Sequence, residues 1–345
     1  MNRTALAFGS RQETSNTDLI SVAQQADSLG YDTLFTGESW GRDAFTILTF
    51  LACHTQALRL ATGIVPVFSR TPALIAQSIA SLDQISQGRA TLGLGTSGRI
   101  VIENWHGQKY RRPLARTREY IKIIRAALSG EAVNHQGNLF QLSRFRLGIS
   151  PIQQHIPIYL ASLGPKNLQL TGELADGWLP VWTHLEHLAA LKETIRAAAD
   201  NAGRDISQVT IAPQILCHVT EDEAELAQAR QDVRGHMAYY VGGMGAYYNN
   251  LFCRYGYQAE AAAIKEAWAN RQREQAAAMI TDEMLDNITI LGDPARCQTK
   301  LEQFRANGAD MPVIAFPHGA SVEAIQRTLE VLAPAKTPTE TSSSA

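Results

Sequence analysis

The chain has 345 residues, of which 45% are hydrophobic, and its 31 lysines and arginines nearly balance 33 aspartates and glutamates. The formal net charge of −2 provides no field that would draw the chain to nucleic acid or an anionic membrane, so we expect neither partner. The four cysteines are widely spaced and include no CxxC pair, so we expect buried thiols. The N-terminus is polar, and no apolar run approaches the ~20 residues of a membrane span, so we expect a cytoplasmic protein.

Short apolar runs alternate with amphipathic stretches through the first half of the chain. The expected strands cover 4–8, 31–35, 58–62 and 89–94, and the expected helices cover 18–29, 43–54, 71–87 and 113–128. The third helix has the clearest signals, because Thr71 can cap it, Pro72 suits its first turn, and Gly88 permits the left-handed turn that ends it. Residues 131–156 carry turn signals without a helical period, which predicts an excursion outside this pattern.

The second half continues the alternation and adds a long helical segment. The expected strands cover 158–161, 177–181, 208–219 and 311–316, and the expected helices cover 166–175, 185–201, 293–306 and 322–332. Residues 221–278 are helix-rich, which predicts an insertion between barrel strands that is long enough to cover the barrel mouth. The repeat favours an α/β TIM (β/α)8 barrel with insertions, including this helical one before the last strands. No linker divides the chain, so we expect one domain over 1–334 and a disordered tail over 335–345.

Glycine-containing loops follow two of the predicted strands. Gly63 ends the third strand, and the loop GTSG at 95–98 ends the fourth. The carboxyl ends of parallel strands are where ligands bind in such folds. Residues 93–98 also fit the dinucleotide pattern GxGxxG, but no helix is signalled before Pro113 and no acid stands at the end of a following strand. A Rossmann nucleotide site is therefore not favoured.

Five segments together resemble a known family. They are TGESWGRDAF (36–45), GIVPVFSRTPALIAQSIASLDQISQGRATLGLGTSG (63–98), NWHGQKYRRPLARTREYI (104–121), IYLASLGPKNLQLTGELADGWLP (158–180) and YVGGMGAYYNNL (240–251). In this order they are similar to the bacterial luciferase-like superfamily, and most similar to its deazaflavin branch of methylene-tetrahydromethanopterin reductase-like enzymes. The resemblance covers nearly the whole chain. It implies a homodimeric or larger oxidoreductase that transfers a hydride between coenzyme F420 and a small organic substrate.

The resemblance implies catalytic and ring-binding residues at the barrel mouth. The bond between Gly63 and Ile64 would be a cis peptide in a bulge that presses on the back of the ring, although this segment can also be read as an ordinary strand exit. Glu38 and Trp40 would line the substrate side, where a carboxyl desolvated by the indole could move a proton. The alternative for Glu38 is a surface carboxylate beside a packed aromatic. Related sugar-phosphate enzymes carry a further acid after the fourth strand, where this chain has Arg99 and a displaced Glu103.

The cofactor phosphate is expected at the start of the helix after the fifth barrel strand. Backbone N–H groups at a helix start, with the helix dipole and a lysine, suit an anion. Without the resemblance, the sequence LGPKN at 163–167 could be a simple connecting turn. The resemblance implies that this segment is the phosphate clamp. The complete set of expected cofactor contacts is Gly63, Ile64, Thr96, Ser97, Gly98, Ala161, Ser162, Gly164, Pro165, Lys166 and Asn167.

The sequence is also compatible with two other functions. The same fold could bind FMN and act as a monooxygenase beside a separate flavin reductase, and a deazaflavin lacks the ring nitrogen that helps to form an oxygen adduct. A non-catalytic flavin-binding barrel is the second alternative. No metal is expected, because His184 and His187 flank Glu186 without a third ligand placed by spacing. His106 is read as a structural histidine.

Overall fold

The computed structural model describes residues 2–10 and 14–335, so the expected tail lies, apart from Ala335, outside the described residues. Among the described helices, none is both long and apolar enough to cross a membrane. All four cysteines are free thiols. Cys217 and Cys297 are buried as expected, whereas Cys53 is exposed.

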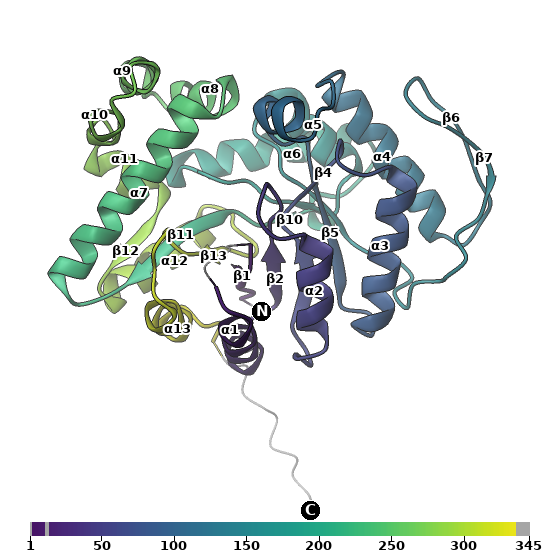
Figure 1. Ribbon diagram of the computed structural model, residues 1–345, viewed down its shortest axis with the longest axis horizontal. Helices are drawn as coiled ribbons and strands as arrows, with labels where there is room; N and C mark the ends of the chain where they lie inside the picture. The colour runs from purple at the N-terminus through teal and green to yellow at the C-terminus, as the bar shows by residue number, and fades with distance from the viewer. Residues whose placement is uncertain (1, 11–13, 336–345) are drawn as a thin grey trace, which may run out of the picture.

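Parallel strands lie at the centre of the molecule (Figure 1), and their pairing arranges them in a ring. In ring order they are β1 (Ala5–Ala7), β2 (Thr33–Thr36), β3 (Arg59–Thr62), β5 (Ala90–Gly95), β8 (Ile158–Leu160), β9 (Gly177–Trp178), β10 (Thr210–Ile211) with β11 (Gln214–Val219), and β13 (Val313–Ala315). β10 pairs with β9 while β11 pairs with β13, which in turn pairs with β1. Since β10 and β11 are successive parts of one strand interrupted at Pro213, the ring closes, and the predicted TIM barrel is confirmed.

An outer layer of helices surrounds the ring (Figure 1). Its members are α1 (Asn16–Leu29), α2 (Ala44–Ala52), α3 (Pro72–Ile85), α4 (Pro113–Leu128), α5 (Pro165–Leu174), α6 (Leu188–Asn201), α12 (Pro294–Ala306) and α13 (Val322–Val331). α3 begins as its sequence predicts, because the Thr71 side chain accepts a hydrogen bond from the Leu74 N–H at 3.2 Å. The shorter elements are β4 (Val65–Pro66), which pairs with β5 in the sheet, and the 3-10 turns Leu185–His187 and Ile206–Gln208.

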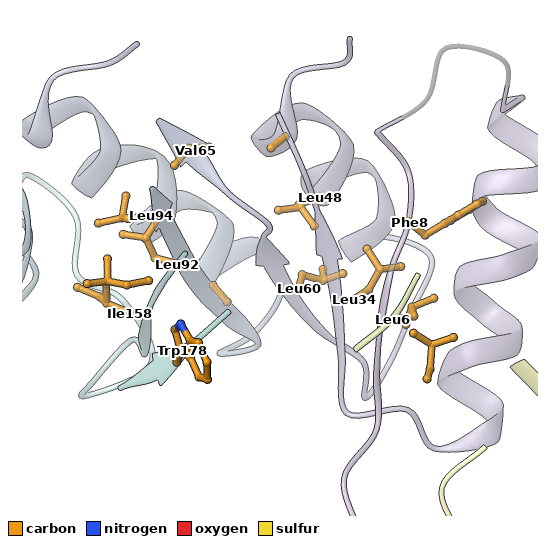
Figure 2. Packing of buried hydrophobic residues seen from close by; sticks show 14 of the residues in the cluster. Leu6, Phe8, Leu34, Leu48, Leu60, Val65, Leu92, Leu94, Ile158 and Trp178 are labelled. Atoms are coloured by element: carbon orange, nitrogen blue, oxygen red, sulfur yellow. The ribbon is translucent and has the colours of Figure 1, made fainter. Parts of the chain in front are cut away.

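Side chains alternate between the two faces of the ring. Leu6, Leu34, Leu60 and Leu92 occupy neighbouring strands and belong to the cluster between barrel and helices (Figure 2). A separate cluster fills the barrel interior, where the Phe35 and Tyr159 rings lie 5.9 Å apart with Leu179, Met311 and Val313 among their neighbours. The barrel is therefore a packed core whose chemistry must lie at one of its ends.

Two excursions leave the barrel pattern. Residues 131–156 contain an antiparallel hairpin of β6 (Val133–Gln136) and β7 (Gln141–Phe145) at the edge of the molecule (Figure 1). The predicted helical insertion comprises α7 (Glu223–Gly243), α8 (Ala246–Arg254), α9 (Gln258–Ala269), α10 (Arg273–Ala278) and α11 (Asp282–Ile288), followed by β12 (Ile290–Gly292). It has its own buried cluster, which includes Met237, Phe252 and Ile264.

One helical element was not predicted from the sequence. Residues Val101–Trp105 form a short π-helix, in which the His106 N–H donates to the Val101 carbonyl at 3.1 Å. The prediction that no helix precedes Pro113 was therefore wrong. A single turn is too short to show a helical period, and only Val101 and Ile102 in it are buried.

Candidate active site

The carboxyl end of the barrel brings the predicted loops together, beginning with the loop after β3. The peptide bond between Gly63 and Ile64 is cis, as the resemblance implied. Two glycines of β5 make room for this segment. A Cβ on Gly93 would lie 1.9 Å from the Thr62 carbonyl oxygen, and a Cβ on Gly95 would lie 2.8 Å from Cδ1 of Ile64. Ile64 is therefore packed against the backbone of β5 at the barrel mouth.

Glu38 is held in an ion pair that the sequence did not reveal. Arg70 donates from its two terminal nitrogens to the two carboxylate oxygens of Glu38, at 2.6 and 2.8 Å. The Ala44 N–H adds a third bond at 3.1 Å, and Arg70 also pairs with Asp43. The Glu38 side chain is only 10% exposed. Both oxygen atoms of this carboxylate thus accept hydrogen bonds, and Glu38 would have to leave Arg70 to exchange a proton with a substrate.

Trp40 follows Glu38 in the same loop and is 56% exposed. The indole is therefore not buried against Glu38. The groups that enclose the Glu38 carboxylate include Arg70 and the start of α2. The displaced acid Glu103 is also occupied, because its carboxylate lies 3.6 Å from the Arg99 guanidinium and accepts from the Tyr110 N–H at 3.2 Å.

The loop at 96–98 lies beneath the helical insertion. The Tyr110 hydroxyl donates towards the Ser97 carbonyl at 3.4 Å and lies 3.3 Å from the hydroxyl of Tyr247 in α8. Burial raises the pKa of Tyr110 above its ordinary value, so the phenol stays protonated as a donor. A Cβ on Gly98 would contact the Met244 side chain at 3.4 Å. The insertion thus reaches across the mouth to the loop that follows β5.

The expected phosphate clamp is the start of α5. Gly164 is its N-cap, so no side chain caps the first turn, and Lys166 is exposed beside it. The Asn167 amide oxygen is buried without a hydrogen-bond partner among the described residues. A half-turn about the last side-chain bond exchanges the amide oxygen and nitrogen, so this side chain can direct a donor towards an anion. The site therefore fits a phosphate.

Ser162 is engaged elsewhere. Its hydroxyl lies 2.6 Å from the Thr171 hydroxyl inside α5, and its carbonyl accepts from the Trp178 indole N–H at 2.9 Å. These bonds join β8 to its neighbours, so the Ser162 side chain has a structural role. Ala161 stands at the end of the same strand, where its N–H donates to the Leu94 carbonyl at 3.0 Å.

A group of aromatic and histidine rings was missed by the sequence analysis. Trp182 follows β9, and its ring lies 5.1 Å from His236 and 5.4 Å from Tyr240, both in α7. His318 follows β13, with its ring 4.5 Å from His236. Trp182 has a φ of 57°, which is rare for a bulky residue and often marks a functional region. The position of Trp182 and His318 just after predicted strands was the available signal.

The histidines at 184 and 187 do not form a metal site. His184 Nε2 lies 3.1 Å from the Tyr257 hydroxyl, and burial lowers the pKa of His184 to about 4. Within residues 2–10 and 14–335, no group of three or more His, Cys, Asp or Glu side chains could hold a metal ion. This histidine is a neutral packing contact between the barrel and the insertion.

Comparison with known proteins gives the family. The model of the luciferase-like monooxygenase family matches residues 4–311. A putative coenzyme F420-dependent oxidoreductase of Mycobacterium tuberculosis is 32% identical, over 89% of this chain and 92% of its own. The 5,10-methylenetetrahydromethanopterin reductase of Methanolobus tindarius is 31% identical, over 87% of this chain and 90% of its own. The chain belongs to the luciferase-like monooxygenase family of oxidoreductases.

A solved structure agrees with the fold. The coenzyme F420-dependent tetrahydromethanopterin reductase of Methanopyrus kandleri superposes with a TM-score of 0.82, covering 95% of this chain and 97% of the other. The two sequences are 23% identical, so this likeness supports the barrel and its insertions.

Proposed function

We propose that this protein is an oxidoreductase that transfers a hydride between coenzyme F420 and a small organic substrate at the carboxyl end of the barrel. The observation that carries the proposal is the similarity to a putative F420-dependent oxidoreductase along 89% of the chain. The uncapped start of α5 supports it, because this first turn carries exposed Lys166 and the amide oxygen of Asn167, which is buried without a hydrogen-bond partner in the described part of the chain. F420 would supply the hydride-carrying ring.

The chain's own residues would bind and orient this cofactor. Ile64 would contact one face of the ring, and the backbone at 96–98 and Ala161 would line its edge. The segment from Gly164 to Asn167 would hold the phosphate through N–H groups, the helix dipole and Lys166. Glu38 and Trp40 would lie on the substrate side, with the proton role of Glu38 dependent on its release from Arg70. Tyr110 and the helical insertion would exclude water from this site.

Binding titrations test the proposed function. We expect purified protein to bind F420 more tightly than FMN under identical conditions and to exchange hydride with it. Equal or tighter binding of FMN, with oxygen uptake beside a flavin reductase, would favour the monooxygenase function that the family name describes. Cofactor binding without turnover of any substrate would indicate an accessory flavin-binding barrel.

The phosphate clamp gives a second prediction. Lys166→Ala should weaken F420 binding by about 1 kcal/mol, as for one charge-assisted contact, because the N–H groups of α5 remain. Affinity for the dephosphorylated chromophore, measured in parallel, should not change. Gly164→Asp should weaken F420 binding at least as much, because its carboxylate repels the phosphate. The substitution itself fits the fold, since a Cβ at Gly164 meets no atom within 4 Å. Equal losses with both ligands would place the phosphate elsewhere.

We also propose that the protein self-associates through the outer faces of α2 and α3. Neither helix presents a charged side chain there, since the one charged residue in them, Asp83, is fully buried. Exposed Leu74 and Ile85 flank a strip of small polar residues in α3. A two-fold interface brings each residue near its own copy or its neighbours, so a face without charge avoids like-charge repulsion.

A single charge on this face should disrupt the assembly. Gln77→Lys is expected to shift the protein from dimer to monomer in light scattering coupled to size-exclusion chromatography. The control is Thr299→Lys, which adds the same charge at an exposed position of α12. An unchanged mass for both variants would locate any interface elsewhere.

A further inference from the structure

Four exposed cations gather at the mouth beside the proposed phosphate clamp. Lys109, Arg111 and Arg112 precede α4, and Lys166 lies in the first turn of α5. Among the described residues, no carboxylate pairs with any of these four, although the chain as a whole has slightly more acidic than basic residues. We name this group the basic rim.

The fold holds the basic rim in place. Residues 107–112 have no regular secondary structure, and Tyr110 is buried between exposed Lys109 and Arg111. The Tyr110 ring stacks on Phe68 with centroids 5.0 Å apart, and its hydroxyl contacts the loop after β5. An anchored central residue turns its two neighbours towards solvent, so both cations lie at the outer edge of the mouth.

The two parts of the basic rim are neighbours in space. α4 and α5 pack side by side, joined by the ion pair of Arg118 with Glu173, and both begin at the carboxyl end of the barrel. Figure 1 shows these helices adjacent to one another. Packed helix axes lie roughly 8–10 Å apart. The cations before α4 are therefore close to Lys166, at about the reach of electrostatic attraction in physiological salt.

Two arginines further along α4 are neutralised. Arg118 pairs with Glu173, and Arg125 donates to Asp176 at 2.8 Å. Exposed Lys122 stands alone in the middle of the helix, whereas three cations stand together before its mouth end. Like charges placed together raise the local positive potential, which attracts anions from solution. Their concentration at one end of α4 therefore indicates a ligand with several negative charges.

We propose that the basic rim binds the acidic tail of the deazaflavin cofactor, an inference that rests on the proposed function. Beyond its phosphate, coenzyme F420 carries a chain of glutamates, and each added glutamate brings one more carboxylate. With the cofactor ring inside the mouth and its phosphate at Gly164 to Asn167, the glutamate tail would emerge at the outer edge of the mouth. The basic rim stands there, so affinity grows with the number of glutamates.

Titrations with cofactor forms of different tail length test this inference. The ligands are F420 without glutamate and F420 with a long oligoglutamate chain, each measured at low and high salt. We expect the long form to bind about tenfold more tightly at low salt, as a few exposed ion pairs allow, and this advantage to shrink at high salt. The double variant Lys109→Glu/Arg111→Glu should lose this advantage, and its affinity for the glutamate-free form should fall by much less than its affinity for the long form.

A matched control separates local from global charge. Lys122→Glu/Arg146→Glu makes the same change in net charge at exposed positions on α4 and beyond β7, away from the mouth. This control should keep the tail-length dependence. Tight binding of glutamate-free F420 without any effect of tail length would overturn the inference and leave the proposed function standing. Failure of every F420 form to bind would refute both.

Discussion

Arg70→Met is expected to lower the free energy of unfolding by about 3–5 kcal/mol. The substitution leaves the Glu38 carboxylate, which is 10% exposed, without its paired guanidinium, and an uncompensated buried charge is strongly destabilising. It also removes the bond to Asp43 and the cation–π contact with Phe45, whose centroid lies 5.4 Å from the guanidinium carbon. Urea unfolding followed by circular dichroism measures the change.

The control for this prediction is Arg118→Met. Arg118 makes the same kind of ion pair with Glu173, but the two side chains are 42% and 34% exposed. Its loss should therefore change stability by about 1 kcal/mol or less. Equal free energies of unfolding for the two variants would show that the Glu38–Arg70 pair contributes no more to stability than an exposed ion pair.

The companion variant Glu38→Gln distinguishes a structural from a catalytic role. It keeps the shape of the side chain and removes its charge, so it weakens the contact with Arg70. A proton-transfer role predicts a turnover loss far larger than the loss in cofactor affinity. Turnover within about threefold of the parent, or roughly 0.6 kcal/mol, would leave Glu38 as the group that positions Arg70.

Most of the barrel could be predicted because its elements have local signals. The helix from Pro72 to Ile85 is capped, apolar on one face and ended by a left-handed turn near Gly88, and each of these features depends on nearby residues. The long strand expected over 208–219 was divided at Pro213, because proline cannot donate to the strand ladder. The helical insertion was predicted from its composition alone.

The site was harder to predict because its contacts join distant segments. Arg70 lies 32 residues from Glu38, so the ion pair has no local pattern. His236 and His318 meet only because α7 packs over the strand ends. The positions of Gly93 and Gly95 were visible, but their purpose depends on Thr62 and Ile64 in the neighbouring segment. The resemblance predicted the cis bond between Gly63 and Ile64, whereas the charge partners of Glu38 depend on the folded arrangement of distant segments.

Gly95→Ala is expected to weaken F420 binding by about tenfold or more while the protein stays folded. The added Cβ would lie 2.8 and 2.9 Å from two side-chain carbons of Ile64, closer than carbon atoms normally approach. Ile64 must therefore move, and overpacking of this kind typically costs about 1–3 kcal/mol. Since Ile64 is proposed to contact the ring, its displacement should appear in the cofactor dissociation constant.

Three further variants give this prediction its controls. Gly148→Ala adds a Cβ that meets nothing within 4 Å, so binding and stability should match the parent. Gly93→Ala places its Cβ 1.9 Å from the Thr62 carbonyl oxygen, which no side-chain rotation relieves, and it should fail to fold. Adding Ile64→Val to Gly95→Ala removes the nearest clashing carbon and should restore part of the affinity. A Gly95→Ala protein that loses stability but keeps its full affinity for F420 would show that Ile64 does not contact the ring.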